Sequence, residues 1–240
     1  MSIFNWSTPT SGLFWEFYDR WIAPSVTQAL EADLHNGVMS RVTKGARVLD
    51  LGCGGGQHAV RVATLRPDVQ VEGIDNAPVM VKRARAFVER SGVHDRVKIH
   101  EGDALNIAFE DSTFDVVYCA GPLKQVTDRL RVLRESYRVL KPGGELLAMD
   151  VDRGCSEKDV ITFCDRTRLP RPFRPMLKIY FQNYVAAQSL DIQEAEMLWS
   201  HFDWTESDGP RAIVDHPALV MVGRKPMQVA HGTDQASEPG

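Results

Sequence analysis

The feature that most constrains the fold is the run Arg47-Val-Leu-Asp-Leu-Gly-Cys-Gly-Gly-Gly56, a short apolar stretch that contains an acid and ends in a cluster of glycines. Its apolar part predicts a strand. The glycines predict a turn in which the backbone can come close to a ligand. The helix that we expect after this turn would offer free N–H groups to the same ligand. The run therefore predicts a cofactor site where a strand meets a helix.

Two classes of cofactor are bound by glycine-rich turns of this kind. The segment Gly54-Gly-Gly56-Gln-His-Ala59 satisfies the dinucleotide fingerprint G-x-G-x-x-G/A, and Asp75 follows at about the spacing of 20 residues that this fingerprint requires. Asp50 argues against a dinucleotide, because a carboxylate beside a pyrophosphate would repel it. The same carboxylate is favourable beside S-adenosylmethionine, which carries a sulfonium and an ammonium. The glycine pattern alone leaves both classes open, and Asp50 favours the second.

The run Val48–Gly56 resembles the first motif of class I S-adenosylmethionine-dependent methyltransferases of the small-molecule kind. Four later segments resemble further motifs of this family in the same order: Gly73-Ile-Asp75, Glu101-Gly-Asp103-Ala104, Phe114-Asp115-Val-Val-Tyr118 and Arg138-Val-Leu-Lys-Pro-Gly-Gly-Glu145. Five segments in register are hard to explain by chance. The resemblance covers roughly residues 40–225. It implies an enzyme that uses S-adenosylmethionine and releases S-adenosylhomocysteine.

Apolar runs alternate with amphipathic segments from Arg47 onward, which predicts an α/β fold. The resemblance implies a doubly wound, Rossmann-like sheet of seven strands, mostly parallel with an antiparallel last strand, and helices on both faces. We expect strands near 47–51, 69–74, 97–101, 114–119, 145–151, 194–200 and 216–223. We expect helices near 57–65, from 78 to 91, 128–140 and 176–189.

Two flanks depart from this core. The first 21 residues hold seven of the chain's 20 aromatic residues, and Phe14, Phe17, Tyr18 and Trp21 share one helix face. This face either covers the edge of the core or roofs the active site. The resemblance favours the roof, so we expect a helical lid over 1–40 and a cofactor-binding domain over 41–225. We expect the tail 226–240 to be disordered.

The second flank is an insertion over 152–190 on the expected substrate side of the domain. It is rich in cations and prolines, and its cations are Arg153, Arg166, Arg168, Arg171, Arg174 and Lys178. Arginines here would suit a carboxylate or phosphate of the substrate. The alternative is a solvated surface that Glu157, Asp159 and Asp165 partly offset.

The resemblance implies roles at the methionine and ribose parts of the cofactor. Gly52 and Gly54 let the backbone approach the methionine part, and Tyr18 lies near it. Asp50 orients the amino group, directly or through water. Asp75 accepts hydrogen bonds from both ribose hydroxyls, which the two oxygens of a carboxylate can do.

The resemblance also implies an adenine subsite. Asn76 borders the adenine, and Asp103 accepts a hydrogen bond from its amine, with the Ala104 N–H nearby. Ala120, after the fourth expected strand, supplies a backbone carbonyl or a wall.

The acceptor half of the site is less determined, and the catalytic residue stays unknown. Where many small-molecule relatives carry Leu-His-His, this chain has Leu123-Lys-Gln125, which leaves Lys124 as a cationic contact. The candidate bases are His58, His201, Asp150 and Asp152. No spacing of two histidines and a carboxylate suggests a metal.

Bulk properties are those of an ordinary enzyme. The net charge of -4 predicts neither nucleic acid nor anionic membrane as a partner, and no apolar run reaches the length of a membrane span. The N-terminus lacks the pattern of a secretory signal, and the four cysteines show no C-x-x-C or zinc spacing, so we expect a cytoplasmic protein. The expected partner is a small-molecule acceptor, anionic or aromatic, bound by a monomer or homodimer.

Three classes of function remain open. The first is methyl transfer to a small molecule, such as a secondary metabolite or a lipid-like acceptor. The second is methyl transfer to RNA or protein, against which the chain shows no separate basic domain and no Asn-Pro-Pro-Tyr signature. The third is a non-catalytic cofactor-binding protein or a dinucleotide-dependent oxidoreductase.

Overall fold

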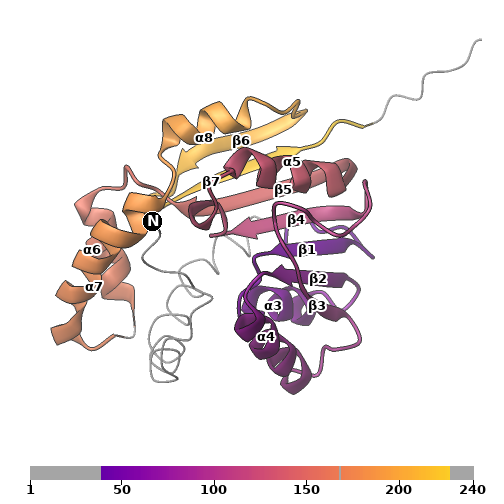
Figure 1. Ribbon diagram of the computed structural model, residues 1–240, viewed down its shortest axis with the longest axis horizontal. Coiled ribbons are helices and arrows are strands. Elements are labelled where there is room, and N and C mark those ends of the chain that lie inside the picture. Colours follow the sequence, from indigo (N-terminus) through magenta and orange to yellow (C-terminus); the bar gives the residue numbers. More distant parts are fainter. Residues whose placement is uncertain (1–38, 168, 228–240) are drawn as a thin grey trace, which may run out of the picture.

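The computed structural model describes residues 39–167 and 169–227. Its centre is a seven-stranded sheet in the order β3-β2-β1-β4-β5-β7-β6, in which β7 runs antiparallel to both neighbours and the other pairs are parallel (Figure 1). The strands are β1 (Arg47–Leu51), β2 (Gln70–Asp75), β3 (Val97–Glu101), β4 (Phe114–Ala120), β5 (Leu140–Val151), β6 (Glu206–Ala212) and β7 (Ala218–Arg224). The expected fold class is confirmed, while the expected lid over 1–40 lies almost entirely outside the described residues.

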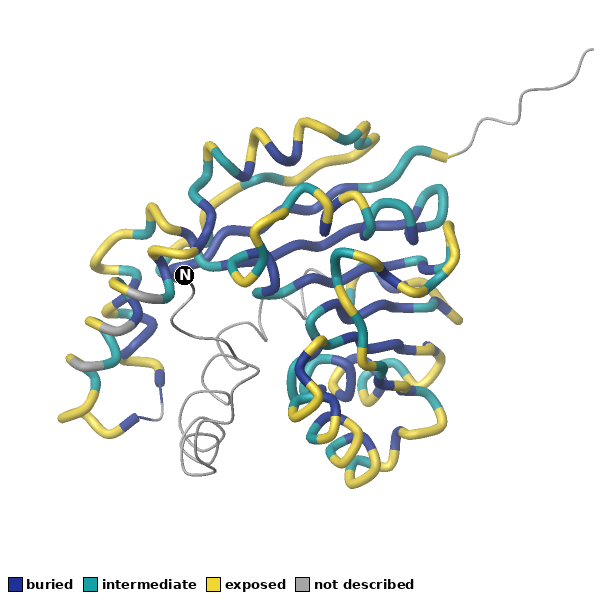
Figure 2. Tube along the Cα trace, in the orientation of Figure 1, coloured by how far each residue is buried: buried dark blue, intermediate teal, exposed yellow. Residues whose placement is uncertain are grey.

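Helices cover both faces of this sheet because alternate residues of its central strands point to opposite sides. The α-helices are α3 (Gln57–Leu65), α4 (Pro78–Arg90), α5 (Arg129–Val139), α6 (Glu157–Arg166), α7 (Arg174–Tyr180) and α8 (Ile192–Trp199). Val48 and Val116 belong to a buried cluster with residues of α3 and α4. Leu49 and Val117 belong to a second cluster with residues of α5 and α8. The buried segments accordingly run through the middle of the sheet (Figure 2).

The direction of the strands fixes where a site can form. The strands β1 to β5 are parallel, so their carboxyl ends meet at one edge of the sheet. The strand order reverses at β1, which lies between β2 and β4. In open sheets of this kind, ligands bind outside the carboxyl ends at the point of reversal.

The strand expected at 194–200 is wrong, because this segment is helix α8. The carboxylate of Asp191 accepts the N–H of Glu194 at 2.9 Å and caps the helix. Ala195, Leu198 and Trp199 are buried at the helical spacing i, i+3, i+4. The sixth strand is instead β6, whose sequence Glu-Ser-Asp-Gly-Pro-Arg-Ala has no apolar run by which to recognise it. Its residues are mostly exposed, and it pairs with β7 at the edge of the sheet.

The insertion is more helical than expected. Helix α6 was missed, although Ser156 and Asp159 form a reciprocal capping box at its start. The helix expected over 176–189 begins earlier, as α7, and continues as a π-helical turn, Phe181–Val185, and a 3-10 turn, Ala186–Gln188. Figure 1 shows α6 and α7 side by side at the end of the molecule away from α3 and α4.

Candidate functional site

The glycine-rich turn joins β1 to α3 at the carboxyl edge of the sheet. The N–H groups of Gly52 and Cys53 donate to the carbonyl of Ile74 at 2.8 and 2.9 Å, which ties the turn to β2. Gly52, Gly54 and Gly56 have φ values of 75°, 52° and 80°, a left-handed conformation that favours glycine. A Cβ added to Gly54 would meet no atom of the described residues within 4 Å. This glycine therefore faces open space from which a ligand can reach the backbone.

Asp75, the last residue of β2, holds the turn from the neighbouring strand. One carboxylate oxygen accepts the N–H of Gly54 and the other accepts the N–H of Ala77, each at 2.9 Å. The carboxylate is half-buried, and each of its oxygens can accept a second hydrogen bond. Asn76 is exposed beside it. The structure thus places Asp75 at the glycine turn, where its carboxylate can still accept hydrogen bonds from a ligand.

Asp50 lies beneath the turn and is only 3% exposed. Its Oδ2 accepts the N–H of Ala59 in the first turn of α3 at 3.1 Å. Burial, opposed by this hydrogen bond and assisted by the charge of Asp75, raises the pKa of Asp50 to about 7. An ionised carboxylate at this position is costly in the free protein, and a cationic ligand would offset that cost. A phosphate would add to it.

Replacing Asp50 with asparagine is expected to stabilise the ligand-free protein at pH 8. The folded-state pKa of about 7 lies above the ordinary value of 3.8, so the stability contributed by the protonated side chain is lost as the pH rises from about 4 through 7. Removing this titration should raise the free energy of unfolding at pH 8 by a few kcal/mol, with about 4 kcal/mol as the upper limit. Thermal unfolding at pH 4.5 and pH 8 measures the effect. An equal gain at both pH values would contradict the assignment.

Asp103 and Ala104 begin the turn that follows β3, at the same edge of the sheet. Asp75 and Glu101 are register partners, so this turn starts beside the end of β2. Asp103 is exposed, and its Oδ1 accepts the N–H of Leu105 at 2.9 Å. Ala104 is partly buried against the second core cluster. The two acidic turns therefore flank one stretch of the carboxyl edge, as the sequence motifs predict.

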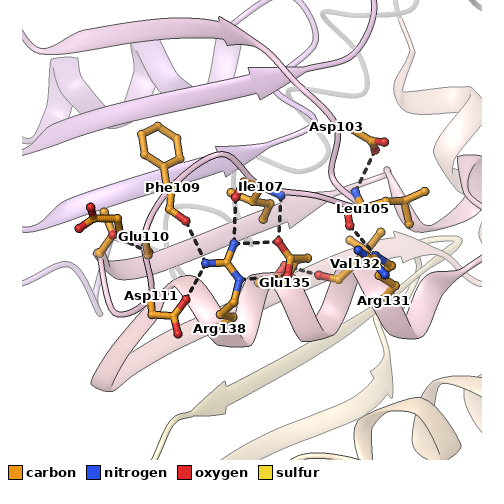
Figure 3. A network of polar contacts seen from close by, with 12 residues as sticks. Asp103, Leu105, Ile107, Phe109, Glu110, Asp111, Arg131, Val132, Glu135 and Arg138 are labelled. Carbon is orange, nitrogen blue, oxygen red and sulfur yellow. Dashed lines mark hydrogen bonds and ion pairs between the residues drawn. The ribbon is translucent and has the colours of Figure 1, made fainter.

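Three residues of α5 hold the 103–111 turn in place (Figure 3). Arg131 Nε donates to a backbone carbonyl of the turn at 2.7 Å. Arg138 donates to two more carbonyls at 2.8 and 2.9 Å and forms ion pairs with Glu135 and an acid of the turn. Their partners in the turn are Leu105, Ile107, Phe109 and Asp111. Sequence reasoning missed this role, although the spacing i, i+4, i+7 places all three residues on one helix face.

Replacing Arg138 with methionine is expected to lower the free energy of unfolding by about 3 kcal/mol. The change leaves Glu135, whose side chain is 16% exposed, without its cation and removes the donor to two carbonyls. Arg134→Met on the same helix is the control, because Arg134 is exposed and should change stability by less than about 0.5 kcal/mol. Urea unfolding compares the two variants. An equal loss of unfolding free energy in both would show that the contacts of Arg138 do not stabilise the fold.

The two carboxylates at the end of β5, expected as candidate bases, are engaged with the backbone. The side chain of Asp150 is 0% exposed. Its two oxygens accept the N–H of Lys124 at 2.8 Å and that of Val151 at 2.7 Å. Asp152, which is 7% exposed, accepts the N–H of Gly154 at 2.7 Å. Asp150 is fully buried with both oxygens engaged, so the structure disfavours it as the base, whereas Asp152 has one oxygen engaged by a backbone N–H.

Lys124 instead presents its ammonium at this edge. Its Nζ donates to the carbonyl of Gly121 at 2.9 Å and lies 3.4 Å from Asp150 Oδ1. Ala120, the expected wall of the cofactor site, ends β4 immediately before this loop and is partly buried. Lys124, which stands where many small-molecule relatives carry a histidine, is therefore part of the carboxyl edge.

Neither histidine candidate is a good base. Burial lowers the pKa of His58 to about 4, so its ring is neutral and a weak acceptor of protons at neutral pH. The ring packs edge-on against Tyr118 with centroids 5.4 Å apart. His201 follows α8 just before β6, whose first residue pairs with Arg224. Arg224 pairs in turn with Glu145, which is the register partner of Val116 near the start of β4. His201 therefore lies at the edge of the sheet opposite the glycine turn.

The cations of the insertion are largely matched by acids of the same region. Arg153 pairs with Asp191 and Glu194, the latter at 3.0 Å. Two more pairs, Arg174–Asp165 and Lys178–Glu157, lie within the insertion itself. Arg168, another cation of the insertion, lies outside the described residues. The same is true of Tyr18, which was expected near the methionine part of the cofactor. The described pairs favour the solvated surface over an anion-binding cluster.

Within residues 39–167 and 169–227, no group of three or more His, Cys, Asp or Glu side chains is arranged to hold a metal ion. The helices in this part of the chain are all too short or too polar to cross a membrane.

A sequence model of the methyltransferase domain family matches residues 42–206, more than half of the chain. A SAM-dependent methyltransferase from Aquifex aeolicus has a similar structure, with a TM-score of 0.58 and 18% identity over 85% of this chain and 98% of that one. At this identity the structural likeness shows the fold alone.

Two curated relatives match just under half of this chain. The 27-O-demethylrifamycin SV methyltransferase of Amycolatopsis mediterranei is 42% identical over 106 residues, which are 44% of this chain and 39% of that protein. The demethylmenaquinone methyltransferase of Listeria welshimeri is 39% identical over 116 residues, 48% of this chain and 49% of that protein. The chain thus matches about half the length, or less, of these relatives.

Proposed function

Because the chain belongs to the methyltransferase domain family, and with it to the class I S-adenosylmethionine-dependent methyltransferases, we propose that it transfers a methyl group from S-adenosylmethionine to a small-molecule acceptor. The products are the methylated acceptor and S-adenosylhomocysteine. The relatives that act on a rifamycin and on demethylmenaquinone support an acceptor of this size, a secondary metabolite or a lipid-like molecule.

The proposal rests on two features of one turn: Asp50 is buried beneath it, and Gly54 within it faces space that the described residues leave open. The site has the donor and acceptor chemistry that S-adenosylmethionine requires: Asp50 would face the cationic methionine part, Asp75 the ribose and Asp103 the adenine amine. Three carboxylates along one edge favour a cationic ligand and disfavour a pyrophosphate. The residues present therefore fit this cofactor.

The chain's own contribution is binding and alignment. The sulfonium of the bound cofactor makes its methyl group electrophilic, so the reaction needs little covalent chemistry from the protein. Asp75 and the Asp103 turn would hold the cofactor so that the acceptor approaches in line from the side of β4 and β5. Excluding water from this edge would strengthen the same contacts.

Calorimetry tests the proposal against its alternatives. We expect binding of S-adenosylmethionine and S-adenosylhomocysteine in the micromolar range and no measurable binding of NAD⁺. Binding of NAD⁺ without S-adenosylmethionine would overturn the proposal in favour of a dinucleotide-dependent oxidoreductase. Mass spectrometry of an extract incubated with S-adenosylmethionine bearing a deuterated methyl group then separates small molecules from RNA and protein as acceptors. Label in RNA or protein only would overturn the small-molecule acceptor.

A further inference from the structure

Lys124 holds an oriented positive charge at the carboxyl edge. Its side chain is 24% exposed, whereas that of its partner Asp150 is 0% exposed. A Cβ added to Gly121 would lie 2.8 Å from Lys124 Nζ, so the loop closes tightly around this nitrogen. The carboxylate of Asp150 also accepts the N–H groups of Lys124 and Val151, which fixes it inside the loop. The pair therefore presents its positive end outward and keeps its negative end buried.

This charge lies next to the glycine turn. A Cβ added to Gly52 would lie 2.3 Å from Pro122 Cγ, which shows that the end of β1 touches the loop that carries Lys124. The charged groups that act on Cys119 in this corner are Asp150, Asp50 and Lys124, of which only Lys124 is cationic. Burial raises the pKa of the Cys119 thiol, which stays protonated and uncharged. Among the residues that the structure describes, Lys124 is thus the cation of this corner that can stabilise an anion.

We propose that Lys124 binds the reacting oxygen of the acceptor, and that the acceptor is therefore an oxygen acid such as a phenol, an enol or a carboxylic acid. This inference rests on the proposed methyl transfer. An ammonium within hydrogen-bond distance favours the ionised form of such an oxygen and lowers its pKa. A protonated amine would be repelled by Lys124, and a neutral amine would gain no charge stabilisation from it.

The step balances without a further reactant. The acceptor oxygen releases its proton to water, and Lys124 donates a hydrogen bond to the resulting anion. The oxygen forms the new bond to the methyl carbon with its own electron pair. The pair of the breaking carbon–sulfur bond stays on sulfur. Asp150 acts as a positioning residue, because its contact is with Lys124 and its carboxylate is closed to the acceptor.

The test is a spectrophotometric pH titration of 4-nitrophenol in the presence of protein saturated with S-adenosylhomocysteine. The yellow phenolate reports ionisation directly, without methyl transfer. In the wild-type protein, the apparent pKa of bound 4-nitrophenol should fall by about 1 unit below that of the free molecule. Lys124→Met should abolish this shift, and Lys124→Arg should retain most of it because the positive charge remains.

Two controls separate the possible failures. The uncharged probe 4-nitroaniline should bind the wild-type protein and Lys124→Met equally. Calorimetry with S-adenosylhomocysteine checks that each variant is folded and loads the cofactor site. If the wild-type protein binds no S-adenosylhomocysteine, the proposed function itself fails. If it does bind, then the absence of a 4-nitrophenol shift, or an equal shift in Lys124→Met, overturns the role of Lys124 alone.

Discussion

Replacing Asp75 with alanine should weaken S-adenosylmethionine binding by roughly 30- to 1000-fold. In the proposed function the carboxylate would accept hydrogen bonds from both ribose hydroxyls, and hydrogen bonds to a charged group contribute about 1.5–3 kcal/mol each. Partial compensation by water leaves a loss of about 2–4 kcal/mol, and each 1.4 kcal/mol corresponds to a tenfold change in affinity. The same change removes the acceptor of the Gly54 and Ala77 N–H groups, which loosens the turn. Calorimetry with S-adenosylmethionine measures the loss.

Asp75→Asn and Asp95→Ala serve as companions to this variant. Asparagine keeps one carbonyl oxygen and should bind the ligand with intermediate affinity. Asp95→Ala changes the net charge by the same amount but lies just before β3, at the opposite edge of the sheet, and should leave the affinity unchanged. Thermal unfolding of all three variants separates loss of the fold from loss of the contact. An affinity of Asp75→Ala within twofold of the wild type would remove Asp75 from the site.

The placement of the candidate cofactor residues at the carboxyl edge is predictable from sequence because these residues are local to the strand ends. Asp50, Asp75 and Asp103 each stand at a fixed offset from an apolar run. The carboxyl ends of parallel strands necessarily meet at one edge. What sequence reasoning could not supply is the environment of each carboxylate. The difference between buried Asp50 and exposed Asp103 depends on α3 packing over one and solvent surrounding the other.

The acceptor half depends on contacts between distant segments, which a single sequence does not reveal. Asp150 reads as an open acid at a strand end, yet it is closed by Lys124, 26 residues earlier in the chain. His201 reads as a candidate base only while α8 is taken for a strand, because its true position follows from the pairing of β6 with β7. Polar β6 lacks the alternating pattern on which strand prediction relies, so its place in the sheet was missed.

A large effect on folding is expected at Gly52, and it arises without any bound ligand. Its φ is 75°, and an added Cβ would lie 2.3 Å from the ring of Pro122. Gly52→Ala therefore combines the cost of a left-handed residue, about 1–2 kcal/mol, with overpacking of about 1–3 kcal/mol. The free energy of unfolding should fall by about 2–5 kcal/mol in total, as urea unfolding would measure. Adding Pro122→Ala to this variant should recover the part of the unfolding free energy that is lost to overpacking. If the double variant recovers no stability, the clash with Pro122 is refuted.

Two other glycines isolate the separate contributions to this effect. Gly45 precedes β1 at the opposite edge and has a φ of 74°. An added Cβ would meet no atom within 4 Å in the part of the chain that the structure describes, so Gly45→Ala measures the backbone cost alone. Gly54, with a φ of 52°, has equally open surroundings but faces the proposed ligand. Gly54→Ala should therefore match Gly45→Ala in stability and yet bind S-adenosylhomocysteine at least about tenfold more weakly, because the methyl group occupies the approach to the backbone. Equal affinities of these two variants would show that the open face of Gly54 is not where the cofactor lies.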